Sequence, residues 1–458
     1  MKDTTEQGVL FEELHDRSVH VQFDQPDSSV DGGALLLKAA DERLGLTASL
    51  AACLEDKRNP DCIIHSYLDM LRQRVFGLAC GYEDCNDTAR LSSDPIHRFV
   101  MDRDPIDGDH LASQPTLCRF ENAIDVRSLD RMGSQLAQGV VDRHRKRLKG
   151  KAKKITIDMD PTDDPTYGQQ QLSFYNNHYS NWCYLPVACF LTFNNESDQY
   201  LFAYVLRPGD AHASHGAIAI LRRIVKRLRQ AFGGTIRIQV RLDGGYAGPE
   251  MFEYLDDEGI DYVIAMASNP TLQGNAEPLM RKARKDSTAS DQTEHHYGEC
   301  EYWPDSWDRD RRVIFKAEVV RHPGREPKDN PRFVVTNLKS SAQHIYEKIY
   351  CNRGDIENRI KELLYGLSID RTSCYRFLSN QFRVLLTAAA YVLMQEIRLN
   401  AAGTSLAKAQ VSTLRSKLLK QAVWIKKTTR RYVLHLPDSA PWRMDWCCIA
   451  RKLGAVPL

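Results

Sequence analysis

Four side chains that could bind a phosphate or a metal ion recur at helical spacing in one segment: Tyr350, Arg353, Glu357 and Lys361. At about 100° per residue they fall within roughly 80° of one another on a helix, beside an apolar face, with Gly366 placed to end that helix. A solvated ladder of ion pairs would explain the same spacing, because each pair four residues apart stabilises a helix by a few tenths of a kcal/mol. The helix alone therefore leaves a structural and a chemical interpretation open.

Carboxylates also stand at the ends of two predicted strands. Residues 155–160 alternate between apolar and polar types, which predicts a strand with Asp158 and Asp160 on one face. A later alternating strand, 236–242, is followed directly by Asp243. Such carboxylates suit hard divalent ions such as Mg²⁺, which prefer oxygen ligands. No glycine-rich phosphate loop or Ser-His-Asp set competes with this chemistry.

The elements that must position these residues change in type along the chain. After an irregular arm with a strand at 19–23, the apolar periodicity predicts helices at 34–44, 63–78, 88–91 and 116–123. From residue 155 the predicted order is β-β-β-α-β-α-β, ending in a buried strand at 261–267. Residues 268–345 are polar with strand-like segments, which predicts an inserted, mainly β module. Helices at 377–399 and 402–420 follow, before a short strand-and-tail segment.

Charge is distributed unevenly over the 458 residues, although the net charge is only +2. Residues 1–60 carry 6 Lys+Arg against 12 Asp+Glu, whereas residues 341–458 carry 19 against 8. Three cationic segments, 143–154, 222–229 and 408–431, favour a polyanionic partner over a merely solvated surface.

The composition also bounds the location and the cysteine chemistry. No apolar run approaches the roughly 20 residues of a membrane span, and the first residues lack the apolar block of a signal peptide, so we expect a cytoplasmic protein. The twelve cysteines are scattered and form no paired Cys-x-x-Cys knuckles. We therefore expect reduced, mostly buried thiols and no zinc site.

The acidic residues and their surroundings resemble a known family, the bacterial insertion-sequence transposases of the DDE class. Asp160-Pro-Thr resembles the first acidic motif of that family, and Asp243-Gly-Gly-Tyr resembles the second. The third motif resembles a Tyr-x-x-Arg-x-x-x-Glu signature, formed here by Tyr350, Arg353 and Glu357.

The resemblance covers most of residues 150–400, and two N-terminal segments extend it. Gly81-Tyr-Glu-Asp-Cys-Asn-Asp and Ser113-Gln-Pro-Thr-Leu-Cys-Arg-Phe-Glu-Asn resemble the pattern of one subfamily. One position departs from the family: many members have Lys seven residues after the glutamate, where this chain has Leu364. Whether Lys361 takes that role stays open.

The resemblance implies an α/β fold with a ribonuclease-H-like mixed-sheet catalytic core. With the sequence pattern, it gives a helical domain at 1–140, the core at 150–267 and 346–400, and a β-rich insertion at 268–345. The helical domain would bind the DNA end, and a helical dimerisation domain without DNA contact is the alternative for the same residues. A basic helical region at 401–458 would contact DNA and support dimerisation.

The implied function is DNA transposition, in which transposon ends are cut and joined to target DNA, with hairpin ends as one route for the second strand. Asp160, Asp243 and Glu357 would hold two Mg²⁺ ions, for which Mn²⁺ could substitute, with Asp158 as the second-choice ligand. The partners would be double-stranded DNA with terminal inverted repeats, target DNA and a second copy of the chain. No membrane or small-molecule substrate is expected. DNA contacts are expected from Tyr350, Arg353, Lys361, Trp303, Trp307, Arg119, Lys426, Lys427, Arg430 and Arg431.

Two alternatives remain at this stage. One is a transposase-derived protein that binds DNA without cutting it. The other is a ribonuclease-H-fold nuclease that cuts DNA without strand transfer. Intact acidic motifs argue against the first, and the long N-terminal region with the insertion argues against the second.

Overall fold

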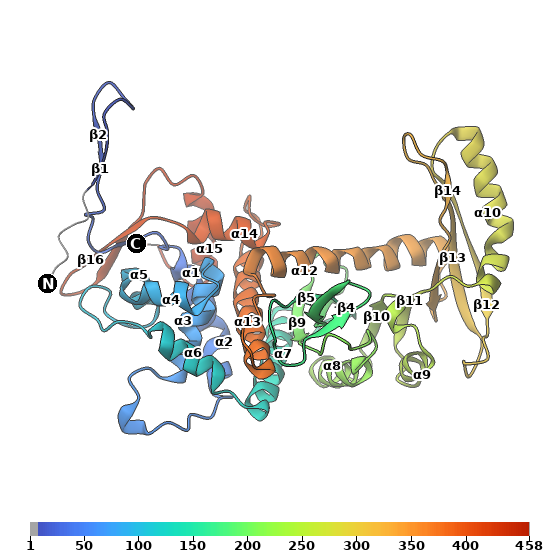
Figure 1. Ribbon diagram of the computed structural model, residues 1–458, viewed down its shortest axis with the longest axis horizontal. Coiled ribbons are helices and arrows are strands. Elements are labelled where there is room, and N and C mark those ends of the chain that lie inside the picture. The colour runs from blue at the N-terminus through green and yellow to red at the C-terminus, as the bar shows by residue number, and fades with distance from the viewer. Residues whose placement is uncertain (1–7, 458) are drawn as a thin grey trace.

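A computed structural model describes residues 8–457 of the chain. The molecule is elongated, with the N-terminal helices and the C-terminal region at one end, a β-sheet in the middle, and a helix-and-strand extension at the other end (Figure 1). Strands β1 (Val9–Phe11) and β2 (Val19–Val21) form an antiparallel hairpin that projects from the body (Figure 1). The predicted strand at 19–23 is thus one half of a hairpin.

Helices dominate the N-terminal region as the periodicity predicts. They are α1 (Ala34–Leu44), α2 (Leu46–Ala51), α3 (Tyr67–Cys80), α4 (Cys85–Arg90), α5 (Pro95–Val100), α6 (Gln114–Asn122) and α7 (Val126–Arg147). The bounds of α1 match the prediction, and α3 begins four residues later because Ser66 caps it with Asp69 in a capping box. The cationic run at 143–154 begins in the last turn of α7, where positive charge stabilises the helix end.

The region predicted to form the core folds into one mixed sheet. Its strands there are β4 (Lys154–Pro161), β8 (Val187–Phe193), β9 (Tyr200–Val205), β10 (Arg237–Leu242) and β11 (Asp261–Met266). In space they run in the order β11-β10-β4-β8-β9. Strand β10 is parallel to both β4 and β11, whereas β8 is antiparallel to β4 and β9. This order is consistent with the ribonuclease-H-like core expected from the sequence.

Helices cover both faces of this sheet. Helices α8 (Ala217–Phe232) and α9 (Pro249–Asp257) pack in one hydrophobic core, and α12 (Gly354–Leu367) and α13 (Phe377–Asn400) pack in the other. Strand β8 shows the alternation, since Val187, Cys189 and Leu191 face the first core and Ala188 and Phe190 face the second.

Helix α13 alone among residues 8–457 is long and apolar enough to cross a membrane. However, 83% of its apolar window is buried inside the protein. It is therefore accounted for as a core helix, packed against α3, α7 and β9.

The segment 268–345 differs from the prediction of a separate β module. It opens with a 21-residue helix, α10 (Pro270–Ser290), which the polar composition concealed. Its strands β12 (Glu294–Tyr302), β13 (Arg311–Val320), β14 (Lys328–Asp329) and β15 (Arg332–Thr336) extend the central sheet, because β15 pairs with β11. The insertion is thus continuous with the sheet of the core.

The signature segment is helical, as predicted, but not uniformly α-helical. After α11 (Ala342–His344), residues Ile345–Tyr350 form a π-helix and Cys351–Arg353 a 3-10 turn before α12 begins. Gly366 does not end this helix, contrary to the prediction. It is buried, and a Cβ there would lie 3.4 Å from Val411, whereas Ser368 with φ +51° ends the helix.

Two small sheets complete the fold. Strands β5 (Asp164–Pro165), β6 (Phe174–Asn176) and β7 (Asn181–Tyr184) form one of them, in the order β5-β7-β6. In the other, β16 (Val423–Lys427) is the central strand and pairs with both β17 (Tyr432–His435) and β3 (Ser28–Ser29).

The C-terminal region is less helical than predicted. The basic helix expected at 402–420 is reduced to α14 (Val411–Leu414) and a π-helical turn at Arg415–Leu419. Helix α15 (Arg443–Lys452), which was not predicted, lies in the tail. All twelve cysteines are free thiols, but only four of them are buried.

Candidate active site

Two neighbouring strands deliver Asp160 and Asp243 to the same edge of the sheet. In the parallel pairing of β4 with β10, Asp158 lies opposite Arg241. Two residues further along each strand, Asp160 and Asp243 therefore come side by side at the carboxyl ends of their strands. The side chain of Asp243 also accepts a hydrogen bond from the Gly245 N–H at 2.9 Å, which fixes its place at the start of the following turn.

Helix α12 brings Glu357 to these two residues. Ile356, Ile360 and Leu363 anchor the helix in the core, and α12 packs against β4. Glu357 lies on the exposed side, and its charge contributes to raising the pKa of Asp160. The structure therefore brings the three predicted acidic residues into one electrostatic environment.

The three carboxylates do not form one close group. Within residues 8–457, their oxygens do not form a group in which all lie within 4.8 Å of one another. Arg353 occupies the space between two of them: its Nη2 lies 2.5 Å from Asp160 Oδ1 and 3.7 Å from Asp243 Oδ2. Its Nε is buried and has no hydrogen-bond partner among residues 8–457. Arg353 therefore supplies the positive charge that these carboxylates face.

The pKa of Asp160 is shifted far from the ordinary value of an aspartate. Burial, together with the charges of Asp243 and Glu357, raises the pKa of Asp160 to about 7, against the lowering effect of Arg353. A carboxyl group that is only partly ionised at neutral pH would gain from an added cation. This is the electrostatic situation expected of a metal ligand before its metal binds.

Asp158, the second-choice ligand, is engaged elsewhere. It is fully buried and accepts two hydrogen bonds from Arg241, at 2.7 and 2.6 Å, and a third from Gln199 at 2.8 Å. Arg241 also donates to the Ile349 carbonyl oxygen at 3.1 Å, so the pair ties β4 to the segment that leads into α12. Its oxygens are thus committed to positioning the site.

The other residues of the signature face also lie beside the carboxylates or in solvent. The ring of Tyr350 packs on Tyr346 with centroids 5.5 Å apart, and burial and the Asp243 charge raise the pKa of its hydroxyl. Lys361 is exposed, one helical turn beyond Glu357, and forms no ion pair with the residues that the structure describes.

Both tryptophans of the insertion lie far from these carboxylates. The loop that carries both tryptophans joins Tyr302 of β12 to Arg311 of β13. The strand register places this loop at the opposite end of the sheet from Asp243. Strand β12 is four strands away from β10, which at about 4.8 Å per strand is roughly 19 Å. Trp307 is also only 8% exposed and packs on Phe252. Neither tryptophan is positioned for a base at the acidic site.

The remaining predicted DNA contacts are distributed over two surfaces. Arg119 is exposed on α6. Lys426, Arg430 and Arg431 are exposed on the β16–β17 hairpin and its turn. Lys427 differs, because its Nζ pairs with Asp104 at 2.6 Å and with Asp107 at 2.8 Å. Its charge is therefore already compensated within the protein.

The sequence interpretation overlooked two features of the site. The first is Arg241, whose position two residues before Asp243 was a usable signal, since parallel pairing opposes it to Asp158. The second is the β6–β7 hairpin beyond Asp160, where the turn residue Tyr179 lies within the electrostatic range of Asp160 and Asp243. The density of aromatic residues at 167–184 was the signal that could have indicated it.

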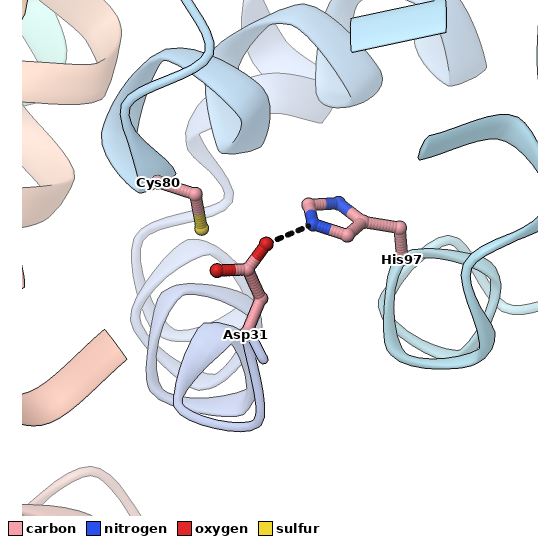
Figure 2. A group of neighbouring side chains, drawn as sticks. All are labelled: Asp31, Cys80 and His97. Atoms are coloured by element: carbon pink, nitrogen blue, oxygen red, sulfur yellow. Dashed lines mark hydrogen bonds and ion pairs between the residues drawn. The ribbon is translucent and has the colours of Figure 1, made fainter. Parts of the chain in front are cut away.

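A second cluster of potential metal ligands lies in the N-terminal region, where Asp31, Cys80 and His97 converge (Figure 2). The negative charge of Asp31 is already balanced within the protein, because Lys420 Nζ lies 2.7 Å from its carboxylate. The Tyr82 hydroxyl also donates a hydrogen bond to this carboxylate at 2.8 Å. Although burial opposes ionisation, His97 and Lys420 hold the pKa of Asp31 below its usual range. Burial raises the pKa of the Cys80 thiol, so the thiolate that a metal would need is disfavoured. We interpret this cluster as a structural ion pair.

Comparisons with known proteins place this geometry in a family. No curated protein matches the chain. Among solved structures, the cryo-EM structure of the piggyBac transposase synaptic complex with hairpin DNA matches with a TM-score of 0.42 and 10% identity. That match covers 94% of this chain and 83% of the other, a likeness too low to carry an argument about function. The family model described as Transposase DDE domain group 1 matches residues 11–456, and the protein therefore belongs to the DDE-class transposases.

Proposed function

We propose that this protein cuts DNA at the ends of a transposon and joins the freed ends to target DNA. The observation that carries the proposal is the meeting of Asp160 and Asp243 at adjacent strand ends, with Glu357 above them on α12. Carboxylates gathered beside an arginine, at the carboxyl ends of adjacent strands, suit the binding and displacement of phosphodiester oxygens.

The carboxylate set fits two divalent ions, with Mg²⁺ the natural choice and Mn²⁺ a substitute. Asp160, Asp243 and Glu357 would hold them, because hard ions prefer carboxylate oxygens, and burial together with the charges of Asp243 and Glu357 raises the pKa of Asp160. When bound, such a pair activates the attacking oxygen and stabilises the leaving oxygen of an in-line displacement. Asp158 would not take part, since Arg241 and Gln199 occupy its oxygens.

The chain's own cations would bind the DNA backbone around the carboxylates. Arg353 can turn its guanidinium from Asp160 to a phosphate, and Lys361 presents a free ammonium group one turn beyond Glu357. Tyr350 supplies a hydroxyl on the same helical face. These groups orient the phosphate.

The partners follow from this function. We propose double-stranded DNA with inverted repeats, bound in part through Arg119, and a homodimer that bridges two ends. Lys426, Arg430 and Arg431 would add salt-sensitive phosphate contacts. Because the substrate is chromosomal, we expect the protein in the cytoplasm at the nucleoid. A hairpin at the excised end is one route for second-strand cleavage.

The triad is tested by Asp160→Asn, Asp243→Asn and Glu357→Gln, with Asp355→Asn as the matched control. Asp355 is exposed on the same helix, two residues before Glu357. Each triad variant should cut end DNA at least about a hundredfold more slowly in Mg²⁺, since loss of a direct ligand exceeds the 10–100-fold cost of losing an outer one. Binding of end DNA and the rate of the control should stay near wild type.

Denaturing gels of labelled end DNA, with and without a target plasmid, measure both the cutting of the end DNA and its joining to the target. Wild-type cutting without joined product would indicate a nuclease in place of a transposase. Binding without any cutting would indicate a DNA-binding derivative. A triad variant that cuts at the wild-type rate would remove that residue from the assignment.

A further inference from the structure

An aromatic surface lies beyond the acidic site on the β6–β7 hairpin. In its antiparallel register Tyr175 lies directly opposite Trp182, so the two rings share one face of the hairpin. They are 49% and 56% exposed, with ring centroids 6.2 Å apart at an interplanar angle of 69°. Tyr167 and Tyr375, which are 94% and 68% exposed, belong to the neighbouring segments. Two exposed aromatic rings paired on one face, as Tyr175 and Trp182 are, indicate a binding surface.

The frame beneath these rings is firmly anchored. Cys183 and Tyr184 on β7 are fully buried. The Asn176 side chain donates to the Gly209 carbonyl oxygen at 2.8 Å. Gly209 itself allows a close approach of two backbones, since a Cβ there would lie 2.0 Å from the Cys183 carbonyl oxygen. The rings are therefore exposed on an ordered support, so their exposure is not that of a loose loop.

The hairpin lies at the same edge of the sheet as the carboxylates. Strand β5 begins three residues after β4 ends, and β7 runs into β8, so the β5–β7 ribbon prolongs the β4–β8 pair past Asp160. Thr166, the residue after β5, donates its N–H to the Trp182 carbonyl oxygen at 2.9 Å. Six residues separate Asp160 from Thr166, which limits the distance along the chain to roughly 20 Å. DNA lying across the acidic site would pass this face within a few nucleotides.

Resting on the proposed function, we propose that Tyr175 and Trp182 form a stacking site for an unpaired base of the DNA held at the acidic site. Planar rings on a fixed support favour a planar aromatic partner. Because these rings lie at the same end of the sheet as the acidic residues, DNA bound at the acidic site is the partner that would reach them. Stacking on aromatic side chains tolerates every base, because each base has a π-face. The site would therefore hold an extruded or overhanging base without reading its identity.

The test measures binding without cleavage, in EDTA, by fluorescence anisotropy. Three labelled end duplexes serve as probes: a blunt duplex, one with a three-nucleotide overhang, and one whose overhang is abasic. The wild-type protein should prefer the normal overhang to the abasic one. In the double variant Tyr175→Ala/Trp182→Ala, the ratio of the affinities for the normal and the abasic overhang should fall by about 5–150-fold, the effect of one stacked base. Its affinity for the blunt duplex should stay within about twofold of wild type.

Matched variants separate stacking from other roles. Trp182→Phe keeps a ring and should retain most of the preference, and Trp303→Ala removes an equally exposed ring elsewhere and should change nothing. Equal wild-type affinity for normal and abasic overhangs would overturn the proposal. So would a changed sedimentation profile of the double variant without DNA, which would make this face a protein interface. Because EDTA prevents cutting, a protein that never cuts DNA can still pass this test, and one that cuts can still fail it.

Discussion

At the scale of single residues, the acidic site is a balance between Arg353 and three carboxylates. Arg353 lies against Asp160 and near Asp243, whereas the charges of Asp243 and Glu357 act on Asp160 in the opposite sense. Burial adds to their effect, so Asp160 holds a proton up to a pH of about 7. Metal binding at this site must displace that proton.

We predict that the affinity for Mn²⁺, used as a spectroscopic probe for Mg²⁺, depends steeply on pH. Below pH 7 the affinity should fall by about tenfold per pH unit, because the proton on Asp160 competes with the ion, and above pH 7 it should level off. Electron paramagnetic resonance of free Mn²⁺ between pH 5.5 and 8.5 measures this. An affinity that does not change across the range would show that Asp160 is not a ligand. Glu357→Gln should bind more weakly and move the break to lower pH, since one charge that raises the pKa is gone.

The same residues show how far the sequence can be interpreted. Strand alternation puts Asp158 and Asp160 on one face and cannot rank them. The choice between them depends on Arg241, which opposes Asp158 only after β4 and β10 pair in parallel register. The resemblance to the family motif favours Asp160, and the hydrogen bonds of Asp158 to Arg241 and Gln199 support that prediction.

At the scale of elements, predictions succeeded where one periodicity dominates. Helix α1 and the strands β4 and β10 follow from clean 3.6- and 2-residue patterns. Helix α10 was missed because it is polar, with Pro278 in its interior, and is supported by packing on β12 and β13. Gly366 was assigned to the helix end by residue type, but it lies inside α12 beside Val411, and the helix ends at Ser368. Such tertiary contacts are not visible in local sequence.

The junction of α7 with the sheet contains a buried histidine. His144 is 4% exposed, and its ring centroid lies 4.7 Å from that of Phe193 and 3.9 Å from that of Tyr200. Burial, with the nearby charges of Arg147 and Arg143, lowers the pKa of His144 to about 2. Since the unfolded chain binds this proton below about pH 6.5 and the folded chain does not, acid should destabilise the fold.

We predict that His144 alone makes the free energy of unfolding fall by as much as about 1.4 kcal/mol for each pH unit below 6.5. His144→Phe keeps an aromatic ring in the stack and removes the titrating group. Urea unfolding of both proteins between pH 4.5 and 7.5 should therefore give a shallower acid decline for the variant. Parallel curves would mean that His144 is protonated in the folded protein.

At the scale of the whole molecule, the two chain ends share one core. The predicted division into an N-terminal domain at 1–140 and a C-terminal region at 401–458 treats them as separate. Yet buried residues of α1 and α3 belong to the same hydrophobic cluster as Leu418, Val423 and Ile449. The Gly32 and Gly33 N–H groups donate to Gln421 and Leu419, and Lys420 pairs with Asp31. Arg119 and the β16–β17 hairpin, which we propose to contact DNA, thus belong to one unit.

Gly33 lies where the N-terminal helices contact the C-terminal region, and this contact leaves no room for a larger side chain. It lies in a helical conformation with φ −77°, so its small size is required by contact and not by its own backbone. A Cβ there would lie 1.8 Å from the Leu418 carbonyl oxygen and 2.6 Å from Leu419 Cα, both backbone atoms that cannot rotate away. Gly33→Ala should therefore lower the free energy of unfolding by at least about 1–3 kcal/mol, the usual cost of overpacking. The matched control is Gly139→Ala in α7, where an added Cβ would meet nothing within 4 Å beyond its chain neighbours and the backbone of its own helix, and about 0.5–1 kcal/mol of stabilisation is expected. Urea unfolding gives both values, and limited proteolysis of Gly33→Ala should expose α1 and the β16–β17 hairpin together. If the hairpin is cut while the N-terminal helices stay protected, the two ends are separate units and the shared core is wrong.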